Sequence, residues 1–176
     1  AWTGLPGLGQ SMEILYILGS TRSGTSALRN ALNLSRFKGY GEGHAVGLLE
    51  GWIASVETAR AQNPQADKAG GNAIARLREH RLIRHLFHAY EQYLSGELNS
   101  KSLMDKTPTI TPITLAPKLN QFHHNPLFLH CGRRHIDNIV SKLRKFPETS
   151  FESHCREWTD CRLAWLEARA AIGPFA

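Results

Sequence analysis

Residues 14–26 read ILYILGSTRSGTS, with Gly19, Arg22 and Gly24 at its turn, and this segment carries the strongest structural signal in the chain. An apolar run typical of a buried strand leads into a turn with a glycine at each end, and a helix-like run at 27–32 follows. Backbone N–H groups and the positive dipole end of a helix attract an anion at such a turn. The segment therefore predicts a phosphate or sulfate site where a strand passes into a helix.

The turn differs from that of a nucleotide triphosphatase in its cation. Gly19 and Gly24 have the spacing of the two glycines in a Walker loop, but Thr25 stands where those enzymes carry their lysine. The positive charge lies inside the turn instead, at Arg22. This arrangement favours a phosphate or sulfate bound without the lysine that handles a γ-phosphate, and it speaks against a kinase or an ATPase.

Length and composition indicate one folded domain with an anionic ligand. With 176 residues, 41% of them hydrophobic, the chain differs from disordered, collagen-like and disulfide-rich proteins. The net charge of +6 favours an anionic partner, but interspersed acids do not indicate nucleic acid. Three cysteines without a C-x-x-C pair indicate reduced thiols. No apolar run reaches the roughly 20 residues of a membrane span, so we expect a cytoplasmic protein.

Hydrophobic periodicity predicts strands that alternate with helices. Residues 1–11 are expected to be a flexible lead-in and residues 12–176 a single domain. Strands are predicted at 13–18, 102–106 and 127–131, helices at 25–34, 45–61, 73–95, 111–121, 137–145 and 151–171, and loops at 37–43 and 63–71. Such alternation favours a parallel sheet. The predicted fold is a three-layer α/β domain, a P-loop-like parallel sheet flanked by helices.

Cations follow each of the predicted strands. The first strand ends at Gly19–Arg22, the second at Lys106 and the third just before Arg133. Because ligands of an open α/β sheet bind at the carboxyl ends of its strands, these cations are expected to converge on one crevice. If Asp137 caps the helix predicted at 137–145, Ser141 lies one turn inside it, with its hydroxyl directed at the anion that Arg133 would hold. The pair predicts a second phosphate site.

Three motifs occur in the order found in one enzyme family: Arg22-Ser23-Gly24-Thr25-Ser26, Asp105-Lys106-Thr107-Pro108 and Arg133-x-x-x-Asp137-x-x-x-Ser141. With them, residues 12–146 resemble the sulfotransferases that use 3′-phosphoadenosine 5′-phosphosulfate. The resemblance implies that the donor's 5′-phosphosulfate is held by the first motif: Arg22, Ser23, Gly24, Thr25 and Ser26. It also implies that Arg133 and Ser141 hold the 3′-phosphate, and that Lys106 stabilises charge at the transferring sulfonate.

The first motif, followed by Gly41-Glu42, is more like the protein-tyrosine and bacterial branch of this family. In that branch a glutamate of this loop is the general base, which makes Glu42 the candidate and His44 the alternative. Lys106 and Arg22 would stabilise the charge that develops during transfer, and the reaction needs no metal. The acceptor is expected to bear a hydroxyl, and a sugar, a tyrosine, a lipid and a small molecule remain open.

Two departures from the family concern its nucleotide pocket. The cytosolic animal enzymes stack an aromatic side chain on the adenine where this chain has Ala27. Their C-terminal Gly-rich nucleotide loop has no counterpart before Ala176, where related enzymes usually continue. The resemblance therefore implies that part of the nucleotide pocket lies outside this chain.

Other interpretations of single residues remain open. A P-loop kinase would need a magnesium-binding carboxylate after a strand, and Asp105 is the one offered. A nucleotide-binding domain without turnover would keep the fold and lose the chemistry. His123-His124 has no spaced carboxylate or cysteine partner, so a loop pair is predicted rather than a metal site. Cys131 is predicted to be a core residue.

Overall fold

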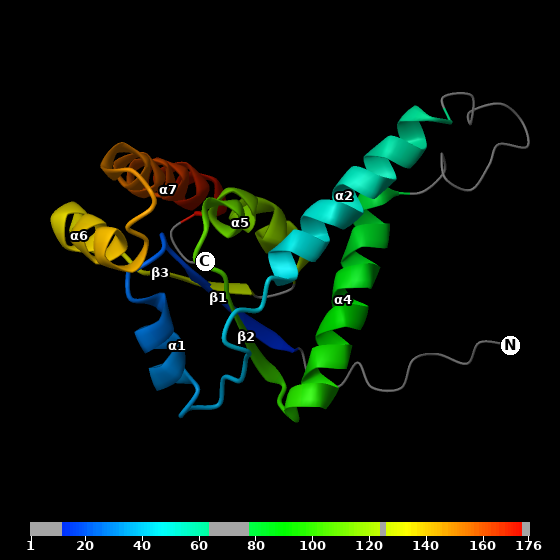
Figure 1. The fold of residues 1–176 in the computed structure, drawn as a ribbon. Helices are drawn as coiled ribbons and strands as arrows, with labels where there is room; N and C mark the ends of the chain where they lie inside the picture. The colour runs from blue at the N-terminus through cyan, green and yellow to red at the C-terminus, as the bar shows by residue number, and fades with distance from the viewer. Residues whose placement is uncertain (1–11, 64–77, 124–125, 174–176) are drawn as a thin grey trace, which may run out of the picture.

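Three parallel strands form the centre of the computed structural model, which describes residues 12–63, 78–123 and 126–173. Strand β1 (Glu13–Leu18) lies between β2 (Ser102–Lys106) and β3 (Pro126–His130), which gives the order β2-β1-β3 (Figure 1). The strands predicted at 13–18 and 102–106 are confirmed, and the third begins and ends one residue earlier than predicted. The predicted lead-in at 1–11 lies outside the described residues.

Six helices flank this sheet in the described ranges: α1 (Thr25–Leu32), α2 (Ala45–Ala61), α4 (Glu79–Leu98), α5 (Ile110–Phe122), α6 (His135–Lys145) and α7 (Phe151–Ile172). The largest differences from prediction are at α1, which ends two residues early, at α4 and at the start of α6. Of the helix predicted at 73–95, residues 73–77 lie outside the described ranges, and α4 continues to Leu98 because its left-handed stop comes at Asn99, with φ of 45°. The loop predicted at 63–71 is described only at Asn63.

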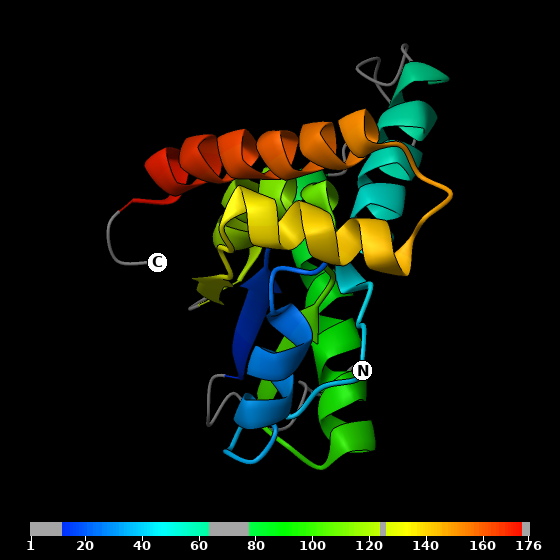
Figure 2. The ribbon, with the colours of Figure 1, turned by 60° about the vertical axis from the view of Figure 1, so that its left-hand side comes forward.

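The sheet has a helix layer on each face. Alternate side chains of β1 point in opposite directions, so Ile14, Tyr16 and Leu18 pack into a core with α2, α4, α5 and α7. Leu15 and Ile17 pack on the other face, where α1 lies (Figure 2). Helix α6 lies beside α7 on the edge near β3. The α/β expectation of a parallel sheet flanked by helices is therefore confirmed.

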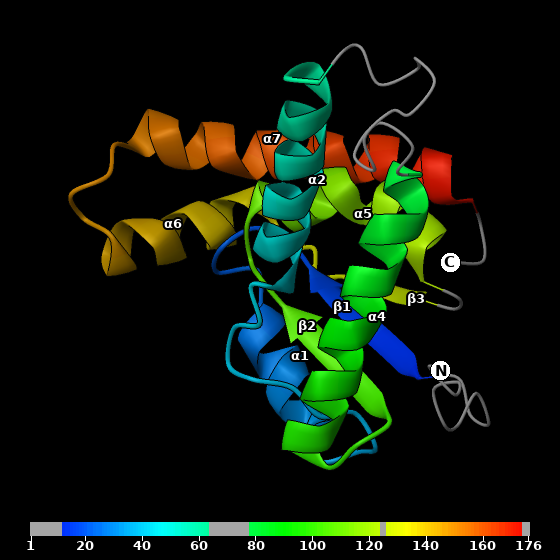
Figure 3. The same ribbon diagram turned by 90° about the vertical axis from the view of Figure 1, so that its right-hand side faces the viewer.

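Helix α2 and the first part of α4 lie side by side and project from the sheet, as Figures 1 and 3 both show, and the rest of α4 runs beside β2. Trp52 and Phe87 meet edge to face between them, and Arg60 pairs with Glu79 near their far end, at 3.2 Å. Within the described residues, no helix combines the length and the apolar character needed to cross a membrane.

The Gly-rich segment 37–43, which follows α1, lies against β2, and its glycines allow this close approach. Lys38 accepts from Met104 N at 2.8 Å and donates its own N–H to Ser102 O at 2.9 Å, so the segment joins the edge of β2 for one residue. A Cβ at Gly39 would lie 2.1 Å from Met104 O. Only glycine allows this approach, which carries the chain along β2 toward its carboxyl end.

Candidate functional site

The anion loop, defined as Gly19–Ser26, leaves donors free at the N-terminus of α1. Gly24 is the N-cap residue of this helix, with φ of 103°, and no side chain caps the helix. The Ser23 hydroxyl is buried and has no hydrogen-bond partner among the described residues. Gly19 is required because a Cβ there would lie 2.7 Å from Cys131 O. The first N–H groups of α1 and the Ser23 hydroxyl are thus placed to bind an anion.

Two side chains, on α6 and α7, and the carbonyl of Pro108 hold the anion loop in place. Asn138 on α6 is fully buried and donates to Thr21 O at 3.0 Å and to Ser20 Oγ at 3.3 Å. Thr21 Oγ1 donates to Pro108 O at 3.1 Å, and Thr21 N donates weakly to Glu157 on α7 at 3.4 Å. Sequence reasoning missed Asn138, since an asparagine inside a predicted helix carries no signal of its own. The loop is therefore built before any ligand arrives.

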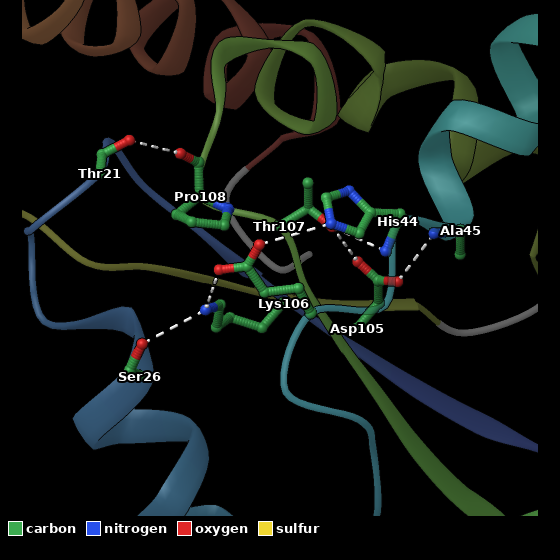
Figure 4. Close-up of polar contacts among 9 residues, drawn as sticks. Thr21, Ser26, His44, Ala45, Asp105, Lys106, Thr107 and Pro108 are labelled. Carbon is green, nitrogen blue, oxygen red and sulfur yellow. Dashed lines mark hydrogen bonds and ion pairs between the residues drawn. The ribbon is translucent and has the colours of Figure 1, made fainter.

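Lys106 joins the anion loop to the segment that carries the candidate base. Its side chain is nearly buried, and Nζ donates to Ser26 Oγ at 3.3 Å and to Glu42 Oε1 at 2.9 Å. Figure 4 shows Lys106 reaching from the end of β2 toward Ser26 on α1. The hydrogen bond from Lys106 holds the pKa of the Glu42 carboxyl below its ordinary value, against the opposing effect of burial, and the charges of Lys106 and His44 lower it further.

The two candidate bases contact each other. His44 Nε2 lies 3.4 Å from Glu42 Oε2, and both side chains are about half exposed or more, at 65% for His44 and 47% for Glu42. Only Glu42 is also bonded to Lys106. Glu42 thus has an open side toward solvent and a closed side against the buried cation, which is the geometry expected of a base that faces an entering acceptor.

Arg22, a residue of the anion loop, contacts both Arg133 and Ser141. Arg22 has a left-handed backbone, with φ of 66°, and its Nε donates to Ser141 Oγ at 3.1 Å. Arg133 Nη1 donates to the carbonyl of Arg22 at 3.2 Å. No contact links Arg22 to Lys106 in the described interactions, so Arg22 belongs to this second cluster.

A cationic cavity of about 500 Å³ lies at this second cluster. Its lining contains four cationic side chains, a single carboxylate and two uncharged residues. The cations are Arg22, Arg133, Arg144 and Lys145, the carboxylate is Asp137, and the uncharged residues are Val140 and Ser141. Sequence reasoning missed Arg144 and Lys145 as site residues, although the basic run 133–145 was a signal for them. An excess of positive charge at a hollow beside the anion loop suits a second phosphate group.

Asp137 does not cap its helix, so the condition used to place Ser141 one turn inside the helix is not met. Helix α6 begins at His135, with Arg134 at the N-cap position, and Asp137 pairs with Arg134 Nε at 2.8 Å inside the first turn. A carboxylate in the first turn suits the helix dipole without serving as the cap. Ser141 therefore lies deeper in the helix than predicted, and its hydroxyl still reaches Arg22.

His123 lies in the connection between α5 and β3, as predicted, but it has partners that the sequence did not reveal. Its Nδ1 lies 2.7 Å from Glu91 Oε1 on α4, its Nε2 lies 2.7 Å from the Tyr16 hydroxyl on β1, and the His123 side chain is only 4% exposed. His123 thus has the carboxylate partner that sequence spacing failed to show, and its side chain is buried although its backbone lies in the connection after α5. His124 lies outside the described residues, and Cys131 is half-buried beside the α1 face of the sheet.

A further cavity of about 530 Å³ lies on the other side of Arg133, between the end of β3, the start of α6 and α7. Its lining includes His135 and Trp158, whose rings meet edge to face at 5.7 Å. Trp158 Nε1 donates to the carbonyl of Arg133 at 3.1 Å. This bond ties the backbone of Arg133, and so one wall of the cationic cavity, to α7.

Models of known protein families give no match to the chain, and no curated protein matches it significantly. Within the described ranges, no cluster of three or more His, Cys, Asp or Glu side chains is arranged to hold a metal ion. Function is therefore inferred from the sequence motifs and from the geometry of the side chains.

Proposed function

We propose that the protein is a sulfotransferase that moves the sulfonate of 3′-phosphoadenosine 5′-phosphosulfate to a hydroxyl acceptor. One observation carries the proposal: the nearly buried Lys106 bonds to the anion loop through Ser26 and to a carboxylate, Glu42, at the same nitrogen. A lysine ammonium has three hydrogens, and these two partners leave one for a sulfonate or bridging oxygen. Anion site, cation and base then meet at one point.

The donor fits the charges on either side of this point. The N-terminus of α1 and the unpartnered Ser23 hydroxyl would bind the 5′-phosphosulfate. Arg133, Ser141 and Arg22 would bind the 3′-phosphate in the cationic cavity, where Arg144 and Lys145 add charge. Two separate anion sites suit a nucleotide with phosphate at both ends of its ribose better than one with a single polyphosphate chain.

The reaction needs a base on the acceptor side and a cation on the donor side. Glu42 would accept the proton of the acceptor hydroxyl as that oxygen bonds to sulfur, and the bond from sulfur to the bridging phosphate oxygen would break. Lys106 would stabilise the charge that collects on this leaving oxygen. The products are a sulfate ester and adenosine 3′,5′-bisphosphate. His44, 3.4 Å from Glu42, is the alternative base.

Asp105 makes the kinase alternative weaker. A kinase would present this carboxylate to magnesium, but Asp105 is 5% exposed and both of its oxygens accept hydrogen bonds, from Ala45 N and Thr107 Oγ1. Burial raises the pKa of Asp105, against the effect of these two hydrogen bonds. A buried carboxylate already satisfied by protein donors is poorly placed to bind a hydrated cation.

The test is transfer of a labelled sulfonate from the donor to a panel of sugar, tyrosine, lipid and phenol acceptors, with the Glu42→Gln variant as control. We expect at least one acceptor to be labelled by the wild type and far less by Glu42→Gln. If no acceptor is labelled while the bisphosphate product binds tightly, the domain binds the nucleotide without turnover. If neither occurs, the proposal fails.

A further inference from the structure

Helix α2 begins immediately after the candidate bases, and it has no cap of its own. His44 occupies the N-cap position with a left-handed backbone, φ 51°, and makes no side-chain cap bond. The first N–H groups of α2 are instead bound by the end of β2. Ala45 N donates to Asp105 Oδ2 at 3.1 Å, and His44 N donates to Thr107 Oγ1 at 3.0 Å, as Figure 4 shows.

Asp105 and Thr107 also bind each other, so the cap is one connected unit. Thr107 Oγ1 donates to Asp105 Oδ1 at 3.1 Å while it accepts from His44 N. Both side chains are buried, at 5% and 6% exposure. An ionised carboxylate beside the N-terminus of α2 also suits the positive end of the helix dipole. Two side chains some sixty positions along the chain thus do the work usually done by a local Ser, Thr or Asp.

Gly43 fits this unit closely. Its N–H donates to Lys106 O at 3.3 Å, and a Cβ at this position would lie 2.0 Å from Asp105 Oδ2. The Asp105 carboxylate therefore occupies the space that any side chain at Gly43 would need. Glu42 directly precedes Gly43, and Lys106 lies between Asp105 and Thr107, so the capping unit joins the two backbones next to the pair formed by Glu42 and Lys106.

We propose that Asp105 and Thr107 are positioning residues: by capping α2 from the end of β2 they hold Glu42 on Lys106 at the distance the reaction needs. This inference rests on the proposed function for its effect on catalysis. Its structural part, the placement of Glu42 on Lys106, can be measured without any turnover. A base displaced by about 1 Å can lose on the order of a hundredfold in rate.

The variants are Thr107→Val, which removes the hydroxyl and changes no charge, Thr107→Ser, which restores the hydroxyl, and Asp105→Asn. The first readout is the pKa of Glu42, followed by NMR of its labelled side-chain carboxyl. In the wild type the bond from Lys106 lowers this pKa. If the pair loosens, the pKa rises in Thr107→Val and in Asp105→Asn, and Thr107→Ser returns it toward the wild-type value.

The sign of the change separates positioning from simple electrostatics. Removing the negative charge of Asp105 would by itself lower the pKa of a nearby carboxyl, whereas loss of the Lys106 bond raises it. A rise in Asp105→Asn therefore cannot come from the missing charge. An unchanged or lowered Glu42 pKa in both Asp105→Asn and Thr107→Val overturns the inference, whether or not the wild type transfers sulfonate.

The second readout is steady-state kinetics. We expect kcat to fall roughly 10- to 100-fold in Thr107→Val, with the affinity for adenosine 3′,5′-bisphosphate unchanged and kcat recovered in Thr107→Ser. Ile83→Val, a change at a fully buried core residue on α4, which takes no part in the capping unit, is the control for lost stability and should keep its kcat. An active wild type with full kcat in both Thr107→Val and Asp105→Asn overturns the inference. A wild type that transfers nothing to any acceptor counts against the proposed function, and the Glu42 pKa then decides the inference alone.

Discussion

The two loops at the carboxyl edge of the sheet differ in what shapes them. The anion loop, Gly19–Ser26, takes its turn from its own glycines and from the start of α1, and Asn138 and Glu157 then hold it in place. The segment 37–44 takes its shape from β2, through Lys38, Gly39, Gly43 and the Asp105 and Thr107 cap. The turn of the anion loop is determined mainly by its own residues, whereas the shape of the segment 37–44 is determined largely by its contacts with the end of β2. Donor binding and base placement should therefore respond to different substitutions.

The largest effect is expected at the base. Glu42→Gln should lower kcat and kcat/KM together by roughly 10²- to 10⁴-fold, because general-base catalysis contributes about that much. Donor affinity should hardly change, since Glu42 contacts Lys106 and His44 rather than the anion loop. His44→Ala should cost far less. An active Glu42→Gln with an inactive His44→Ala would transfer the role to the histidine.

The pH profile of kcat/KM sharpens the same distinction. Since Lys106 lowers the pKa of Glu42 in the free enzyme, a Glu42 base stays deprotonated as the pH falls to roughly 5, its ordinary pKa being about 4.3. The rate should then be flat down to that pH. Loss of activity that begins at a distinctly higher pH would contradict the assignment to Glu42.

A smaller loss is expected at the cation between the two loops. Lys106→Met should lower kcat by roughly 10²- to 10³-fold, the usual cost of one donor to a developing oxyanion. It should also raise the pKa of Glu42, which loses the bond that lowers it. Lys118→Met, an exposed lysine on α5, is the matched control. Wild-type activity in Lys106→Met would remove the residue from the chemistry.

Selective loss of donor recognition is expected in the cationic cavity. Arg133→Ala and Ser141→Ala should each weaken the binding of adenosine 3′,5′-bisphosphate by about 1.5–3 kcal/mol, because each removes a charge-assisted contact to the 3′-phosphate. Adenosine 5′-phosphosulfate, which lacks the 3′-phosphate, should bind these variants as it binds the wild type. The matched control for Arg133→Ala is Arg156→Ala, because Arg156 is an exposed arginine on α7 and its loss makes the same change in net charge. Calorimetry measures the affinity of each variant for both ligands. Equal losses of affinity for the two ligands would mean that the substitution damages the fold.

The smallest effect is expected where α7 supports Arg133. Trp158→Phe keeps an aromatic ring and removes the bond from Nε1 to the Arg133 carbonyl. One neutral hydrogen bond contributes about 0.5–1.5 kcal/mol, so the affinity for the bisphosphate should fall by a few-fold and kcat should be unaffected. A kcat loss with unchanged affinity would show that Trp158 acts on the Glu42 side instead.

Local patterns predicted what depends on local chemistry. The three strands followed from apolar runs, and parallel pairing places Lys106 and Arg133 at the same edge of the sheet. The single crevice expected for the cations is not formed by all of them, because the cavity there is lined by Arg22 and Arg133 without Lys106. The bond between Lys106 and Glu42 joins two predicted site residues, but its existence depends on how closely Gly39 and Gly43 let the chain approach β2.

The contacts that the sequence did not reveal depend on partners distant in sequence or on competition between neighbours. His123 was assigned no carboxylate because Glu91 comes from another helix, and only the packing of α4 on α5 brings them together. Asp137 fits the composition of a cap, but its carboxylate binds Arg134 instead. Asp105 resembled a metal ligand in sequence, and its true partners, Ala45 N and Thr107, are visible only in the fold.

The most direct test of a sulfonate-donor site is a calorimetric titration of the wild-type protein with adenosine 3′,5′-bisphosphate, AMP and ATP with magnesium. The two anion sites predict that the bisphosphate binds without magnesium and at least roughly tenfold more tightly than AMP, because a charge-assisted contact to the 3′-phosphate contributes about 1.5–3 kcal/mol. Equal affinity for the bisphosphate and AMP, or tighter binding of ATP with magnesium, would contradict the account.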